Sequence, residues 1–190
     1  MIKEFARPVD FINKQSQLPS FRYRDSRIIK HLSKLDLSGY ILDIGERTVM
    51  TQRMEDALNI KIGNTMGDLD EKFFPFEKRD IKYDVIIFSH VIEHLFNPLL
   101  CLKGIKKLMK PDAALVICTP IKPHYLPWGK GHFHEMDEYR FKQLMKRAEL
   151  KIIRWEKWSN GPLFCDLGIR PILRKLFWKE QSFVVLRKKI

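Results

Sequence analysis

The stretch Tyr83-Asp-Val-Ile-Ile-Phe-Ser-His-Val-Ile-Glu-His-Leu95 joins a run of apolar residues to a run of ionisable ones. Residues 82–89 have the near-continuous apolar character of a strand that is buried on both faces of a parallel sheet. His90, Glu93 and His94 follow directly after that strand. Because ligands bind beyond the carboxyl ends of the strands in open α/β sheets, Ser89 and His90 at the end of this strand are among the first residues to inspect for a functional site.

Two further apolar runs predict buried parallel strands beside this one. They are residues 40–45, which close on Gly45, and residues 114–119, which close on Pro120. Apolar residues at helical spacing predict helices around these strands, the first of them capped by Asp25 and Ser26. The expected helices are 25–38, 51–58, 98–109 and 137–148, the expected last strands are 151–158 and 183–188, and residues 110–112 are expected to form a turn.

Strands that alternate with helices predict an α/β fold with a Rossmann-like, doubly wound and mostly parallel sheet. The two C-terminal strands are expected to form an antiparallel pair. Only 39 positions separate Gly45 from Asp84, whereas two helices and two strands with their loops would need about 50. The sheet is therefore expected to lack about one helix of the usual set. Residues 1–190 are expected to form a single domain, with residues 159–181 as an insertion between the last two strands.

These segments resemble the motifs of class I S-adenosylmethionine-dependent methyltransferases, of the small-molecule and glycan type. Ile41-Leu-Asp-Ile-Gly45 is similar to the first motif of that family, and Tyr83–Leu95 matches its fourth-strand motif. The resemblance covers about residues 26–158. It implies S-adenosyl-L-methionine as the cofactor and methyl transfer as the reaction. Further similar segments are Gly67-Asp-Leu-Asp-Glu-Lys-Phe-Phe-Pro-Phe76, Leu108-Met-Lys-Pro-Asp112 and His132-Phe-His-Glu-Met-Asp137.

The glycine-rich loop of the family is altered in this chain. It reads Gly45-Glu-Arg-Thr-Val-Met50 and keeps only the first glycine. Extra glycines let the backbone approach a cofactor closely, so the side chains that replace them here must turn away. The resemblance assigns the cofactor site to a set of residues at the strand ends, with Asp68 on either the ribose or the adenine. This set is Asp43, Gly45, Glu46, Arg47, Asp68 and Ser89.

Five of the six histidines lie between positions 90 and 134, and all of them follow predicted strand ends. Methyl transfer to a hydroxyl needs a base as well as positioning, and histidine titrates near neutral pH. His90 and His132 are therefore the first candidates for the base. Glu93 is expected to hold a histidine or the acceptor, and His134 is expected to line the same pocket.

The segment His90-Val-Ile-Glu-His94 also matches the inverted zinc-protease pattern His-x-x-Glu-His. It begins at the end of a buried strand rather than within a long helix, and the methyltransferase resemblance accounts for the same residues, so no metal site is expected. His132 and His134 could bind an ion as a pair, but hydrogen-bonded surface histidines are the simpler interpretation. Because phosphate-binding and dinucleotide-binding loops are absent from the sequence, a nicotinamide enzyme or a nucleotide hydrolase has no support.

The net charge of +12 comes from the C-terminal part of the chain. Residues 1–40 carry +4, residues 41–100 carry −4 and residues 101–190 carry +12. A basic face favours an anionic partner such as nucleic acid, a phosphorylated sugar carrier or a membrane surface, although it also serves solubility. Apolar and basic residues alternate at helical spacing over Ile169–Lys179, which predicts an amphipathic helix that covers the acceptor pocket or touches anionic lipid.

The three cysteines, Cys101, Cys118 and Cys165, are widely spaced, and the N-terminus has no apolar core of signal-peptide length. We therefore expect reduced thiols in a cytoplasmic protein. The predicted function is methyl transfer from S-adenosylmethionine to a hydroxyl or carboxyl acceptor, for example an anionic glycan or a lipid-linked molecule. Two alternatives remain. The altered loop favours a degenerate methyltransferase fold that only binds, and the net charge favours an RNA methyltransferase, although no RNA-reading motif supports it.

Overall fold

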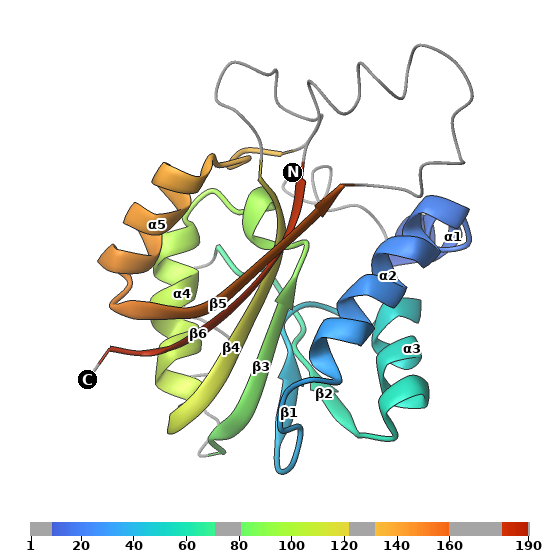
Figure 1. Ribbon diagram of the computed structural model, residues 1–190, viewed down its shortest axis with the longest axis horizontal. Coiled ribbons are helices and arrows are strands. Elements are labelled where there is room, and N and C mark those ends of the chain that lie inside the picture. Colours follow the sequence, from blue (N-terminus) through green and yellow to red (C-terminus); the bar gives the residue numbers. More distant parts are fainter. Residues whose placement is uncertain (1–8, 71–80, 122–131, 160–179, 190) are drawn as a thin grey trace.

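Six strands form one sheet in the computed structural model, and helices cover both of its faces (Figure 1). The structure describes residues 9–70, 81–121, 132–159 and 180–189. The strand order is β2-β1-β3-β4-β6-β5, in which β6 alone runs antiparallel to its two neighbours. The strands are β1 (Ile41–Asp43), β2 (Ile62–Asn64), β3 (Tyr83–Ser89), β4 (Met109–Ile121), β5 (Leu150–Ser159) and β6 (Glu180–Lys188).

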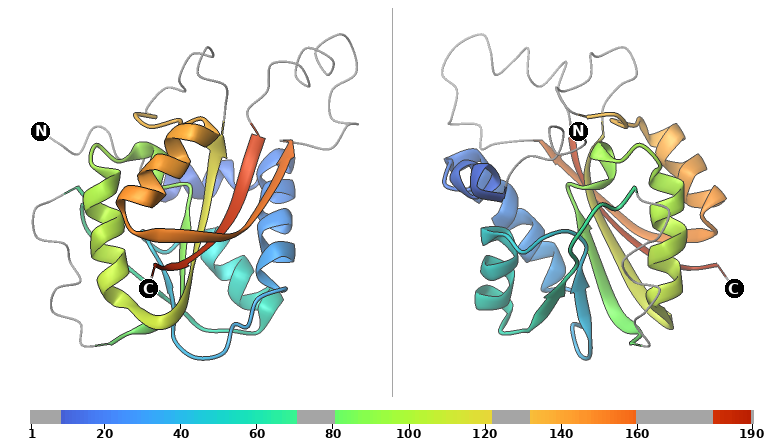
Figure 2. Two further views of the ribbon diagram at one scale, coloured as in Figure 1. Left: turned by 60° about the vertical axis from the view of Figure 1, so that its left-hand side comes forward. Right: turned by 180° about the vertical axis from the view of Figure 1, so that it is seen from behind.

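Two pairs of helices enclose the sheet. Helices α2 and α3 lie on one face and α4 and α5 on the other, with α1 beside the start of α2 (Figures 1 and 2). A short 3₁₀ helix, η1, follows β3 and carries Glu93 and His94. The helices are α1 (Val9–Gln15), α2 (Pro19–Leu32), α3 (Val49–Leu58), η1 (Ile92–His94), α4 (Pro98–Leu108) and α5 (Glu138–Arg147). This architecture confirms the predicted α/β, Rossmann-like, mostly parallel sheet with an antiparallel C-terminal pair.

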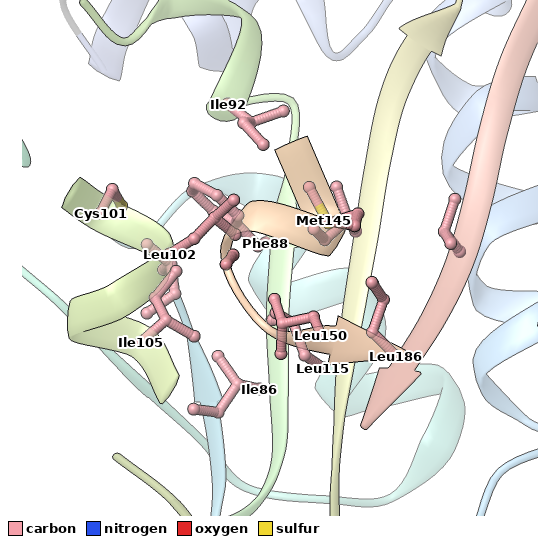
Figure 3. Packing of buried hydrophobic residues seen from close by; sticks show 14 of the residues in the cluster. Ile86, Phe88, Ile92, Cys101, Leu102, Ile105, Leu115, Met145, Leu150 and Leu186 are labelled. Carbon is pink, nitrogen blue, oxygen red and sulfur yellow. The ribbon is translucent and has the colours of Figure 1, made fainter. Parts of the chain in front are cut away.

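The central strands β1, β3 and β4 are adjacent, as their apolar runs predict. Alternate residues of β3 supply two separate cores, because successive side chains of a strand point to opposite faces. Ile86 and Phe88 pack with α4 and α5 (Figure 3), whereas Val85 and Ile87 pack with α2 and α3. Each fully buried side chain of this size contributes about 1.5–3 kcal/mol to folding. The carboxyl ends of the strands are thereby held on a rigid base.

The prediction that Asp25 caps the first helix is wrong. Helix α2 begins at Pro19, whose fixed φ suits the first turn of a helix, and it ends at Leu32. Asp25 lies buried inside α2, where its carboxylate pairs with Arg24 and with Arg53 of α3. The Arg53 Nη1–Asp25 Oδ2 distance is 2.6 Å. Asp25 therefore joins α2 to α3 through an ion pair and does not cap a helix.

The predicted turn at residues 110–112 is part of β4 instead. Tyr83 pairs with Met109 and Val85 pairs with Ala114, so the residues between them in β4 bulge out of the ladder. A bulge accommodates proline within a strand, because proline has no N–H to donate. The Lys110 ammonium lies 2.8 Å from the carboxylate of Asp84 and holds the bulge against β3. Strand β4 is therefore longer than its apolar run.

The predicted loss of one helix between β2 and β3 falls mainly on residues 71–80, which lie outside the described residues. Residues 65–70 and 81–82 form neither helix nor strand. Residues 160–179 lie outside the described residues. They include most of the predicted insertion 159–181, the predicted amphipathic helix Ile169–Lys179 and Cys165. Within the described part, Cys101 and Cys118 are buried free thiols. None of the described helices is both long enough and apolar enough to cross a bilayer.

Candidate functional site

The conformation of the loop after β1 is fixed by the backbone of Gly45 and its hydrogen bonds. Its φ of +123° is one that residues with a Cβ rarely adopt. The Gly45 N–H donates to Thr65 Oγ1 at 2.7 Å, and the Gly45 carbonyl accepts from Thr65 N and from Asn64 Nδ2. A Cβ built at Gly45 would meet only Val91 among the described residues, at 3.7 Å. Hydrogen bonds from the end of β2 therefore fix this loop without the further glycines of the family motif.

The side chains that replace those glycines turn outward, as the altered loop predicts. Glu46 is exposed, and Arg47 is 51% exposed. The Arg47 guanidinium forms an ion pair with Glu55 of α3, and this hydrogen bond helps to hold the pKa of Glu55 below its usual value. The guanidinium of Arg47 is thereby held beside α3.

Asp43, the last residue of β1, is a buried carboxyl group beside this loop. Burial raises its pKa to about 7, even though Thr51 Oγ1 and Asn64 Nδ2 donate to Asp43 Oδ2 at 2.8 and 3.4 Å. These two donors are neutral, so they offset the cost of burying the charge only in part. A ligand that brings a positive charge to this position would favour the ionised carboxylate.

The structure separates the roles of two neighbouring aspartates after β2. Asp68, the predicted ribose or adenine ligand, is exposed and accepts a hydrogen bond from Asp70 N within its own turn. The carboxylate of Asp70 instead accepts from Phe96 N and Asn97 N, at 2.9 and 2.8 Å. Asp70 therefore joins the loop after β2 to the loop after η1. Nothing in the spacing of the sequence distinguishes the two aspartates.

His90 follows Ser89, the half-buried last residue of β3, with a left-handed φ of +55°. Its Nδ1 lies 3.2 Å from Glu93 Oε1, and its buried Nε2 has no hydrogen-bond partner among the described residues. Burial, together with the charge of Arg24 from α2, lowers the pKa of His90. The imidazole is therefore neutral near pH 7, donating from Nδ1 and keeping Nε2 as a bare acceptor.

Glu93 is the centre of the polar contacts after β3. It is 1% exposed, and its Oε2 accepts from the Thr119 hydroxyl of β4 at 3.1 Å. Burial alone would raise the pKa of Glu93, but the hydrogen bond from His90 and the charges of His90 and His94 lower it. Glu93 is therefore an anion in contact with His90, and holding a histidine is one of the two roles that the sequence predicts for it.

The segment that follows β4 docks onto the same residue. Phe133 N and His134 N both donate to the Glu93 carbonyl, at 2.8 and 3.0 Å. This brings the His132 ring to 4.5 Å from the ring of His94, while His132 Nδ1 contacts the buried carboxylate of Glu135.

The structure brings three of the four predicted acceptor residues together and leaves the fourth at the edge. His90, Glu93 and His132 share one cluster, whereas His134 Nε2 contacts the Phe96 carbonyl at its edge, at 3.2 Å. Two members of the cluster, His94 and Glu135, were not among the predicted site residues. His94 belongs to the quoted motif, but no pattern in the sequence pairs it with His132.

Comparison with known proteins identifies the family of this chain. Residues 21–154 match a family model described as a methyltransferase domain. The chain belongs to this methyltransferase family. A search of curated proteins returned no significant match. The predicted enzyme class is thereby confirmed, and the zinc-protease interpretation of His90–His94 gains no support.

Solved structures show the same fold at low sequence identity. A candidate methyltransferase from Bacillus halodurans has a TM-score of 0.61 and 9% identity over 87% of this chain and 100% of its own. The [4+2]-cyclase SpnF has a TM-score of 0.62 and 12% identity, covering 92% and 85%. The mitomycin 7-O-methyltransferase MmcR has a TM-score of 0.51 and 16% identity, covering 90% and 58%. These likenesses establish the class I methyltransferase fold.

The residues at the end of β1 fit S-adenosylmethionine, the cofactor that this fold implies. The cofactor is cationic at its sulfonium and amino groups, and the buried carboxyl of Asp43 is a group whose ionised form a nearby cation would favour. At Gly45 the backbone carries no Cβ, so a ligand can approach it closely. The altered loop therefore keeps both features that its chemistry requires.

Proposed function

We propose that this methyltransferase transfers a methyl group from S-adenosylmethionine to a hydroxyl group of its acceptor, with His90 as the general base. The observation that carries the proposal is the buried Nε2 of His90, which has no partner among the described residues while Nδ1 contacts Glu93. An unused acceptor atom on a neutral, oriented imidazole at a strand end is the arrangement that proton abstraction needs.

The cofactor side of the proposed site is the loop after β1. Asp43 and the Gly45 backbone would hold the cofactor there, with Glu46 and Arg47 contributing backbone atoms and Ser89 following at the end of β3. When bound, S-adenosylmethionine supplies a sulfonium methyl group for in-line displacement. Asp68 is exposed and accepts from Asp70 N through Oδ1, which leaves Oδ2 to accept from a cofactor hydroxyl or amine.

The acceptor side is the cluster around Glu93. The hydroxyl proton passes to His90 Nε2, and the adjacent Glu93 carboxylate stabilises the imidazolium that forms. A base of this kind contributes about 10²–10⁴-fold to the rate. A carboxyl acceptor, already ionised at pH 7, would not need it. The base therefore supports a hydroxyl over a carboxyl acceptor, and the basic C-terminal half supports an anionic one, such as a phosphorylated glycan or a lipid-linked molecule.

The proposal is tested by incubating the protein with S-adenosylmethionine that carries a tritiated methyl group and a panel of acceptors. The panel contains catechols, hydroxy acids, neutral sugars and phosphorylated sugars. Transfer to a product that resists mild alkali identifies a methyl ether and supports a hydroxyl acceptor. Transfer to an alkali-labile product identifies a methyl ester and contradicts the role given to His90. Bound cofactor without transfer to any acceptor favours the binding-only alternative.

A further inference from the structure

The geometry points to a binding site for a divalent transition-metal ion at Glu93, His94 and His132. One ligand atom from each of these side chains lies within 4.8 Å of the other two. Two imidazoles and a carboxylate are the ligand set of a common kind of zinc site in enzymes. The histidines favour Zn²⁺, Co²⁺ or Fe²⁺ over Mg²⁺ and Ca²⁺, which prefer oxygen ligands alone.

The backbone holds the two halves of this site together before any ion binds. Glu93 and His94 belong to η1, whereas His132 comes from the segment after β4. Two N–H groups of that segment, those of Phe133 and His134, donate to the carbonyl of Glu93 itself. A tetrahedral ion with ligand distances of about 2.1 Å holds its ligands about 3.4 Å apart. Small side-chain rotations would therefore close the site.

The surroundings of His132 match those of a metal ligand. Its Nδ1 contacts the carboxylate of Glu135, which is 2% exposed, so Nε2 is the nitrogen left for an ion. Histidines that bind metals nearly always donate their other ring N–H to a carboxylate or a carbonyl in this way. Glu135 lies three residues after His132 and would orient this histidine without itself binding the ion.

Glu93 can serve the ion and its present partners together. Its Oε1 contacts His90 and its Oε2 accepts from Thr119, but each carboxylate oxygen has two lone pairs. His90 is not a ligand in this arrangement, because the ligand atoms that gather here belong to Glu93, His94 and His132. The site therefore differs from the His-x-x-Glu-His zinc pattern, which would use His90 and His94.

Ion binding requires no cofactor, so this inference stands apart from the proposed methyl transfer. Three protein ligands leave coordination positions for water or for an acceptor oxygen, and only the latter use rests on the proposed function. Bound to an ion, an acceptor hydroxyl would lose its proton more readily. The site would then select acceptors with a hydroxyl oxygen that can reach the metal.

Cobalt titration of the untagged, chelator-treated protein tests the site. The visible absorption of Co²⁺ reports nitrogen and oxygen ligands without any assay of activity. We expect saturation at one ion per chain, with affinity lowered at least 10-fold in His94→Ala and in His132→Ala. Glu135→Gln should weaken binding about 10-fold while keeping one ion per chain.

His134→Ala is the matched control, because His134 lies two residues from His132 and contacts the Phe96 carbonyl. It should bind Co²⁺ as the wild type does. Far-UV circular dichroism verifies that each variant is folded, and His132→Asn replaces His132→Ala if the latter is not. Absence of saturable binding in the wild type would overturn the inference. So would unchanged affinity in the folded His132 variant, or an equal loss in His134→Ala.

Discussion

Two buried carboxyl groups near the ends of neighbouring strands, Asp43 after β1 and Glu93 after β3, have opposite pKa shifts. Burial raises the pKa of Asp43 to about 7, and its hydrogen bonds come from the neutral donors Thr51 and Asn64. Burial acts on Glu93 in the same direction, but His90 and His94 reverse it and lower its pKa. Both carboxyl groups are buried, so the different sign of their pKa shifts comes from their neighbours.

The difference assigns separate tasks to the two loops. The hydrogen bonds to Asp43 come from neutral donors, and the nearby charge of Arg47 lowers its pKa less than burial raises it, so a cationic ligand would favour its ionised form. Glu93 has its partners within the chain itself, since it contacts His90 and accepts from Thr119, and the hydrogen bond from His90 favours its ionised form. The loop after β1 thus offers backbone geometry and a carboxyl group that a cationic ligand would ionise. The loop after β3 offers side chains that already contact one another.

The largest expected effect concerns the second loop. His90→Asn removes the proposed base but keeps a residue that tolerates a left-handed φ. Turnover should fall about 10²–10⁴-fold while the affinity for S-adenosylmethionine stays unchanged. Turnover with the acceptor found in the panel and calorimetry of the cofactor give the two values. Full turnover in His90→Asn would show that the base lies elsewhere.

The next effect belongs to Asp43 and concerns stability. Between about pH 4 and pH 7 the folded protein holds the Asp43 proton and the unfolded chain does not, so rising pH destabilises the fold. Asp43→Asn removes this dependence. Relative to the wild type, the variant should gain at most about 4 kcal/mol between pH 4 and pH 8. Urea unfolding across this range measures the gain, with Asp68→Asn at an exposed carboxyl as the control. A constant difference would contradict the raised pKa.

Glu93→Gln should show the opposite sign of pH dependence. Because the pKa of Glu93 is lowered in the folded state, its charge stabilises the fold above the unfolded pKa, and this stability is lost as the pH falls below it. The variant should be less stable than the wild type by about 1–3 kcal/mol at neutral pH, since a charged acceptor is replaced within a buried network. The difference should shrink toward pH 3. If the stability difference between the wild type and Glu93→Gln grew on acidification, the lowered pKa of Glu93 would be contradicted.

The smallest effect tests the backbone of the first loop. Gly45→Ala introduces a Cβ at a positive φ, although that atom would meet only Val91 at 3.7 Å among the described residues. We expect a loss of about 1–2 kcal/mol from backbone strain alone. Gly63→Ala in β2 is the matched control, since its Cβ would make ordinary contacts at 3.6 Å or more. Equal losses in thermal unfolding would remove strain as the explanation.

The sequence could predict the parts of the fold that rest on long apolar patterns. β3 and the middle of β4 are near-continuous apolar runs, and Asp137 does cap α5 by accepting from Arg140 N. β2 was not located, because it has three residues and Gly63 interrupts its pattern. Asp25 resembled a cap because Asp-Ser often starts a helix, and only its ion pair with Arg53, across 28 positions, shows its role.

The candidate site divides in the same way. The rule that ligands bind beyond strand ends was enough to select His90, Glu93 and His132. The contact between His94 and His132, 38 positions apart, depends on backbone hydrogen bonds that bring the two segments together. Asp70 and Glu135 were missed for the same reason, since each acts through a partner whose position only the folded chain defines.

Calorimetric titration with S-adenosylmethionine and S-adenosylhomocysteine, in two buffers of different ionisation enthalpy at pH 6.5, tests the central claim most directly. We predict saturable binding of one ligand per chain, accompanied by release of a proton, because the cationic ligand lowers the raised pKa of Asp43. Asp43→Asn should bind more weakly and release none, whereas His90→Asn should bind as the wild type does. No heat of binding with either ligand, or binding that Asp43→Asn leaves unchanged in affinity and proton release, would contradict the account.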